Sequence, residues 1–144
     1  MDSTISGLDG EDRRRFPRFP TPKGSFAALR SLPEKVGAIR DVSLGGLAFE
    51  YVVDAFADPF QGDFDGEIDI FTVDRRVALR RIPCCMIRDK LLARSSESFF
   101  ASTLNVRHCA IQFKRLEEDK ARSLEDFISL CQDAEAGFLP QAVQ

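Results

Sequence analysis

The chain has 144 residues, a length that suits one domain with a single continuous core. Its hydrophobic content of 44%, charged content of 30% and formal net charge of −3 exclude a disordered or membrane-embedded chain. No apolar run approaches the ~18 residues of a membrane span, and the N-terminus lacks the apolar stretch of a secretory signal, so we expect a cytoplasmic protein without membrane insertion.

The N-terminal region is predicted to be a tail followed by an extended arm. Residues 1–11 are polar and aperiodic, which is typical of a flexible tail. Residues 12–23 read DRRRFPRFPTPK, and their three prolines bias the chain away from helix. Because side chains alternate on an extended chain, Arg14 and Arg18 are expected to point the same way.

Residues 24–115 are predicted to form a β-barrel. They contain short segments that alternate or are rich in β-branched and aromatic residues, bounded by turn residues. The apolar positions of the last segment change parity midway, which predicts a β-bulge near Arg107 and His108. The expected strands are 25–31, 36–40, 47–53, 67–73, 77–88 and 103–113, with loops at 54–66 and 89–102.

Residues 116–136 change to the period of an amphipathic helix. The apolar stripe recurs at helical spacings, with charges on the other face, and we expect it to pack on the barrel. Gly137 suits a C-terminal stop, and residues 137–144 are expected to be a tail. The stripe consists of Leu124, Phe127, Ile128 and Cys131. Six short strands followed by one helix indicate a mostly β fold, an antiparallel barrel with a helix packed against it.

The segment Asp41-Val42-Ser43-Leu44-Gly45-Gly46 joins two predicted strands as a turn. Asp and Ser bond their own backbone in turns, while glycines permit positive φ and close backbone approach. The carboxylate of Asp41 can accept two parallel N–H bonds, which matches the N1–H and amine of guanine. Arginine forks match guanine O6 and N7, and they match phosphate equally well. Arm and turn together predict a site for an anionic guanine nucleotide.

A second arginine pair with the same spacing, Arg76 and Arg80, shows that the arm alone is not specific. We assign this second pair to an exposed strand face. The specificity of the prediction therefore comes from the Asp/Ser/Gly turn that follows the arm.

These residues resemble the PilZ domain family of bacterial cyclic di-GMP receptors. The family's RxxxR motif falls on Arg14 and Arg18, and Arg13 matches the basic residue that often precedes it. The [DN]xSxxG motif falls on Asp41, Ser43 and Gly46. The resemblance implies a PilZ domain over residues 12–136, with a six-stranded antiparallel barrel, a C-terminal helix and a nucleotide site formed by these six residues.

The resemblance further implies a receptor that needs no cofactor and is not an enzyme. It would bind cyclic di-GMP, change conformation and signal to a protein effector that the sequence does not identify. The arginines of the arm repel one another and are expected to have few fixed partners, so we expect a mobile arm that the dianionic ligand orders.

Three alternatives remain open at this point. One is a PilZ-like adaptor that binds proteins and no nucleotide. Another is a nucleic-acid module that uses the arginine arm, although an overall acidic chain argues against it. The third is a metal site formed by His108 with cysteines, which the opposite directions of adjacent strand residues disfavour. We instead expect four reduced cysteines, with Cys109 and either Cys84 or Cys85 in the core and His108 near the surface.

Overall fold

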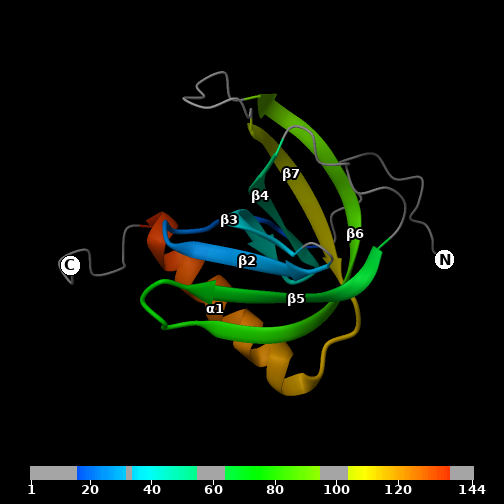
Figure 1. The fold of residues 1–144 in the computed structure, drawn as a ribbon. Helices are drawn as coiled ribbons and strands as arrows, with labels where there is room; N and C mark the ends of the chain where they lie inside the picture. Colours follow the sequence, from blue (N-terminus) through cyan, green and yellow to red (C-terminus); the bar gives the residue numbers. More distant parts are fainter. Residues whose placement is uncertain (1–15, 32–33, 55–63, 95–103, 137–144) are drawn as a thin grey trace.

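The computed structural model of the chain describes residues 16–31, 34–54, 64–94 and 104–136. Arg13 and Arg14 lie outside these residues, as do the predicted tails 1–11 and 137–144. In chain order the elements are β1 (Phe19–Pro20), β2 (Ser25–Arg30), β3 (Lys35–Ser43), β4 (Gly46–Asp54), β5 (Phe64–Thr72), β6 (Ala78–Arg94), β7 (Leu104–Phe113) and α1 (Glu118–Ala136) (Figure 1).

Strands β2 to β7 form a closed antiparallel barrel. Their order is β3-β2-β5-β6-β7-β4, and β4 pairs back with β3 to complete the ring. The short strand β1 joins the other side of β3 and belongs to the segment predicted to be an extended arm. The predicted six-stranded barrel is therefore confirmed, with one additional strand. Closure satisfies the backbone hydrogen bonds of strands that would otherwise have open edges.

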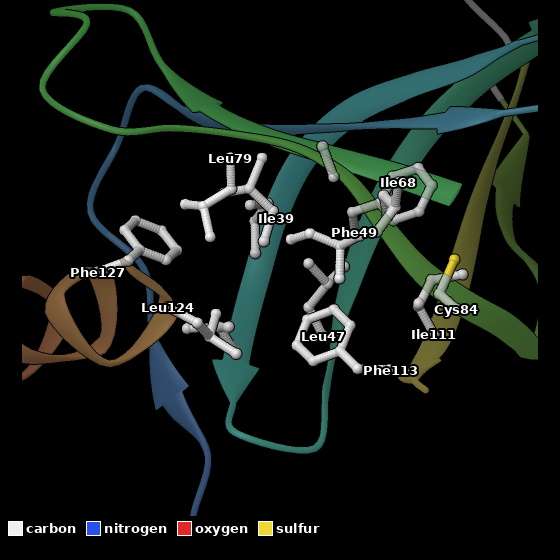
Figure 2. Close-up of a cluster of buried hydrophobic side chains, with 14 of the residues drawn as sticks. Ile39, Leu47, Phe49, Ile68, Leu79, Cys84, Ile111, Phe113, Leu124 and Phe127 are labelled. Atoms are coloured by element: carbon white, nitrogen blue, oxygen red, sulfur yellow. The ribbon is translucent and has the colours of Figure 1, made fainter. Parts of the chain in front are cut away.

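The core fills the barrel and extends to the helix. Alternation along β4 sends Leu47 and Phe49 inward, and both are fully buried. Figure 2 shows Leu124 and Phe127 of α1 facing this core, and the whole predicted helix stripe is buried. Burying one such side chain stabilises the fold by about 1.5–3 kcal/mol. Among the described residues, no helix combines the length and the apolar character needed to cross a bilayer.

Strand β6 is longer than the sequence predicted. It continues to Arg94, so the predicted loop 89–102 is wrong for residues 89–94, and the remainder of that loop lies outside the described residues. The polar stretch is a strand because it pairs with β7, for example Asp89 with Cys109. In Figure 1 this part of β6 projects with β7 beyond the barrel, at the end away from α1.

Other boundaries also differ from the prediction, and α1 begins at Glu118 rather than at residue 116. Strand β5 begins at Phe64 rather than at residue 67, and Asp54 belongs to β4, so both ends of the predicted loop 54–66 are strand. Strand β3 runs to Ser43, which places half of the predicted Asp41–Gly46 turn inside a strand. In each case cross-strand pairing extends a segment through residues of low strand propensity, namely Asp41, Asp54 and Gly66.

The predicted bulge in β7 is wrong. Strand β7 pairs with β4 without interruption from Leu104 to Gln112. The irregularities lie in the neighbouring strand β6, and one of them is opposite Val106 and Arg107. The change of parity has another cause: Cys109 faces the core, whereas Leu104 and Val106 lie on the opposite face of the same regular strand.

Candidate functional site

The described part of the arm lies antiparallel to the second half of β3. Phe19 pairs with Val42, and Pro20 pairs with Asp41. The hydroxyl of Thr21 donates to the carbonyl oxygen of Ile39 at 2.6 Å. Proline is tolerated at this position because β1 is an edge strand and needs no second ladder partner. The predicted extended conformation is confirmed at Phe19 and Pro20.

This pairing brings the two predicted motifs together at Arg18 and Asp41. Nη1 of Arg18 donates to Oδ1 of Asp41 at 2.5 Å, and the side chains are 25% and 33% exposed. The expectation that the arginines of the arm have few fixed partners is therefore wrong for Arg18. The positions of Arg13 and Arg14 relative to this pair lie outside the described residues.

A β-bulge directs Asp41 toward the outer face of the barrel. The register of β3 against β4 shifts between Ile39 and Asp41, which makes Arg40 the extra residue. Ile39 and Val42 are both buried in the core, so the two residues between them share the outer face. Regular alternation from Ile39 would have sent Asp41 inward. The sequence signal for this bulge is a pair of polar residues between two apolar residues that are three positions apart, Ile39 and Val42.

The turn between β3 and β4 is shorter than predicted. Ser43 pairs with Gly46, which leaves Leu44 and Gly45 as a two-residue hairpin loop. The hydroxyl of Ser43 accepts a bond from the backbone N–H of Gly45 at 3.0 Å and lies 3.4 Å from the carbonyl oxygen of Gly46. The predicted bonding of Ser43 to its own turn is therefore confirmed, and the residue is 5% exposed.

The two glycines of the turn serve close approach rather than positive φ. Positive φ values among the described residues occur only at Gly24, Arg75 and Arg81, so that part of the expectation is wrong. A Cβ on Gly46 would lie 2.1 Å from the carbonyl oxygen of Ile111 in β7. A Cβ on Gly45 would lie 3.0 Å from the ring of Phe16 in the arm. Gly46 thus permits strand packing, and Gly45 permits the arm to reach the turn.

Small side chains continue the outer face beside Asp41. Ala48 is its partner on β4, and Ala110 is the partner of Ala48 on β7. Both alanines alternate with core residues, so they face outward, yet they are only 2% and 8% exposed. At the rim of this floor, Arg40 forms an ion pair with Glu50. The floor is the flat surface formed by Ala48 and Ala110. A flat, polar ring that carries an anion could lie on this floor and bond to the carboxylate of Asp41 and to the arginines beside it.

The other arginines, cysteines and the histidine considered as candidates occupy positions that need no binding role to explain them. Arg80 is exposed on β6, as expected, whereas Arg76 is exposed in the turn that precedes β6, so its assignment to a strand face is wrong. Cys84 and Cys109 are buried free thiols, and burial raises the pKa of each from 9.0 to about 12. His108 is half-buried rather than at the surface. Within the described ranges, no group of three or more metal-ligating side chains is placed to hold a metal ion.

Comparison with known proteins identifies the fold. The sequence matches no protein-family model and no curated protein. The solved PilZ domain with c-di-GMP of YcgR from Escherichia coli is similar, with a TM-score of 0.63 and 15% identity over 88% of this chain and 99% of that chain.

Two longer solved chains are also similar. YcgR in complex with c-di-GMP from Escherichia coli has a TM-score of 0.60 and 19% identity, over 87% of this chain and 49% of that chain. The K. pneumonia MrkH–c-di-GMP complex has a TM-score of 0.59 and 20% identity, over 87% of this chain and 54% of that chain. The present chain thus spans about half the length of these two proteins. In its fold, the chain is a PilZ-type domain.

Proposed function

We propose that the chain is a bacterial receptor domain for cyclic di-GMP. The proposed site consists of Arg18 and Asp41, together with Arg13, Arg14, Ser43 and Gly46. The observation that carries the proposal is the direct contact between Arg18 and Asp41 beside the floor of Ala48 and Ala110. The similar solved structures are the PilZ domain of YcgR with c-di-GMP and the MrkH–c-di-GMP complex, and they support the choice of ligand.

Recognition would use the complementary chemistry of the two paired residues. The carboxylate of Asp41 can accept the two N–H groups on one edge of guanine, and the guanidinium of Arg18 can donate to the other edge or to phosphate. Ser43 would act indirectly, because its hydroxyl is engaged in holding the hairpin loop. Since the ligand replaces an existing ion pair, several charge-assisted bonds of about 1.5–3 kcal/mol each are required for a net gain.

The arm offers a route from the site to the rest of the molecule. Strand β1 follows Arg18 directly and contacts both β3 and α1. A ligand that takes Arg18 away from Asp41 would therefore move a segment that also touches the helix. We propose that the resulting change at β1 and α1 is the signal that a protein effector reads.

The proposed role is recognition rather than catalysis. The groups gathered at the site are a carboxylate, arginines and the backbone of a tight hairpin, which bind anions and guanine edges. We also propose a cytoplasmic location, because the four cysteines are free and that compartment keeps thiols reduced.

The test is a calorimetric titration of the folded protein with cyclic di-GMP, with GTP and cyclic di-AMP as controls. We expect binding of cyclic di-GMP alone, with amide shifts at residues 16–20 and 40–47. Arg18→Ala and Asp41→Ala should abolish binding, while Arg80→Ala, an exposed arginine on β6, should not change it. A folded protein that gives neither heat nor shifts would refute the proposal and favour the adaptor function.

A further inference from the structure

Arg40 is an arginine that neither sequence motif includes, yet it lies beside Asp41 on the outer face. It is the extra residue of the bulge in β3, and the buried Ile39 and Val42 on either side direct it outward together with Asp41. The backbone N–H of Thr21 in the arm donates to the carbonyl oxygen of Arg40 at 3.4 Å. The arm therefore touches the chain on both sides of the Asp41 position.

The guanidinium of Arg40 forms an ion pair with the carboxylate of Glu50 on β4. The side chain of Arg40 is 59% exposed, whereas that of Glu50 is 24% exposed. Most of the Arg40 side chain is thus open to solvent, and a group arriving from outside can reach it. An ion pair with so much exposure is a weak contact, which a better acceptor can replace.

Glu50 lies on the same face as the proposed nucleotide floor. It follows Ala48 by two residues on β4, so both side chains point outward and are neighbours along the strand. A carboxylate at this position repels a dianionic ligand over Ala48 unless a cation neutralises it. Arg40 is the cation that pairs with Glu50 in the structure, and it directly precedes Asp41 in β3.

We propose that Arg40 is a further ligand-binding arginine of the site, and that Glu50 and the phosphates of the nucleotide compete for it. This inference rests on the proposed function. Its consequence is that Glu50 weakens binding in the wild-type protein, so the affinity is set by the Arg40–Glu50 pair as well as by Arg18 and Asp41. The bulge is the feature that places Asp41 beside Arg40, because it keeps two consecutive polar residues on one face.

The test compares the dissociation constants of cyclic di-GMP for two pairs of matched variants, measured by calorimetry. Glu50→Gln should tighten binding by about two- to fivefold, the range expected of a partly exposed ion pair. Its control is Glu67→Gln, which removes the same charge from a carboxylate paired with the exposed Arg81 at 3.3 Å. The control should leave the affinity unchanged. A change seen only in Glu50→Gln is then due to the position of Glu50 and not to the net charge of the protein.

Arg40→Ala should weaken binding by about fivefold or more and should reduce the salt dependence of the affinity, because one cation no longer meets phosphate. Its control is Arg122→Ala, which removes an exposed arginine from a 3.3 Å pair on α1. Arg40→Lys, which keeps the charge, should retain part of the affinity.

Equal affinities for Glu50→Gln and Glu67→Gln, or for Arg40→Ala and Arg122→Ala, would overturn the inference while the wild-type protein still binds. A wild-type protein that does not bind cyclic di-GMP would overturn the proposed function itself and this inference with it.

Discussion

Arg18 and Asp41 are partners in the structure, with 2.5 Å between Nη1 and Oδ1 although 23 residues separate them in the chain. The two residues expected to read a guanine nucleotide therefore also hold the arm against β3. We therefore expect a single alanine substitution at either position to change both nucleotide recognition and the attachment of the arm. Experiments on the site have to separate these two effects.

Exchanging the two residues separates attachment from recognition. Arg18→Asp or Asp41→Arg alone should destabilise the fold by about 1 kcal/mol or less, because the pair is partly exposed. The double variant Arg18→Asp/Asp41→Arg should recover this loss, since the ion pair can form again. It should still not bind cyclic di-GMP, because the acceptor for guanine is no longer beside Ala48. Urea unfolding and calorimetry measure the two properties.

A swapped protein that binds the nucleotide as tightly as the wild type would contradict this prediction. It would show that the site needs an ion pair of opposite charges at this position, whichever of the two residues carries the carboxylate.

The two glycines of the hairpin should respond differently to alanine. Gly46→Ala places a Cβ 2.1 Å from the backbone oxygen of Ile111, so β4 or β7 has to shift and the melting temperature should fall by several degrees. Gly45→Ala meets the ring of Phe16, which can move with the arm, so the melting temperature should change little. Nucleotide binding should nevertheless weaken in Gly45→Ala. Equal losses of stability in the two variants would be inconsistent with this assignment.

Much of the fold could be predicted from sequence because it depends on local periodicity. The stripe of Leu124 and Phe127 predicts one buried helix face, and short apolar segments predict six strands. The outward position of Asp41 departs from regular alternation, and its sequence signal is confined to the two polar residues between Ile39 and Val42. This position depends on a shift in pairing between β3 and β4, which is a tertiary property.

The strand character of residues 89–94 was also beyond local reasoning. Aspartate is a residue type typical of loops, yet the side chain of Asp89 is 2% exposed, within the layer formed by β4, β7 and β6. Its partners, Tyr51 and Arg107, are 38 and 18 residues away. Only the fold shows that a charged residue at this position is satisfied.

This buried cluster should dominate the stability of the projecting part of β6. Asp89 accepts bonds from the hydroxyl of Tyr51 at 2.5 Å and from Nε of Arg107 at 2.8 Å. Its hydrogen bond raises the pKa of Arg107, while burial raises that of Tyr51, so the Arg107 cation and the neutral Tyr51 are the favoured forms. Asp89→Ala should cost about 3–5 kcal/mol, because it leaves a largely buried guanidinium without its anion.

The matched control is Asp65→Ala, which removes the carboxylate of an exposed 3.2 Å pair with Lys114. Urea unfolding should show little change for this control. Tyr51→Phe should give an intermediate loss of about 1–3 kcal/mol, since Asp89 keeps Arg107. If Asp89→Ala is no more destabilising than Asp65→Ala, the buried cluster of Asp89, Tyr51 and Arg107 does not stabilise the fold.

The buried thiols should make the protein less stable in alkali. Burial raises the pKa of Cys84, Cys109 and Cys131 from 9.0 to about 12 in the folded chain. As the pH rises, the unfolded chain therefore loses these protons first, and the folded state is disfavoured. The free energy of unfolding should be constant with respect to these groups below about pH 9 and fall between about pH 9 and 12.

The slope of this alkaline loss identifies its source. Each thiol contributes up to about 1.4 kcal/mol per pH unit, because one proton is released on unfolding. Cys131→Ala removes one of these protons, so its slope should be smaller than that of the wild type. Leu130→Ala truncates a partly buried, non-titrating neighbour on the same helix, so it should lower stability at every pH and keep the wild-type slope. Equal slopes in the wild type and Cys131→Ala would contradict the prediction for Cys131, because its thiol would then make no contribution to the alkaline loss.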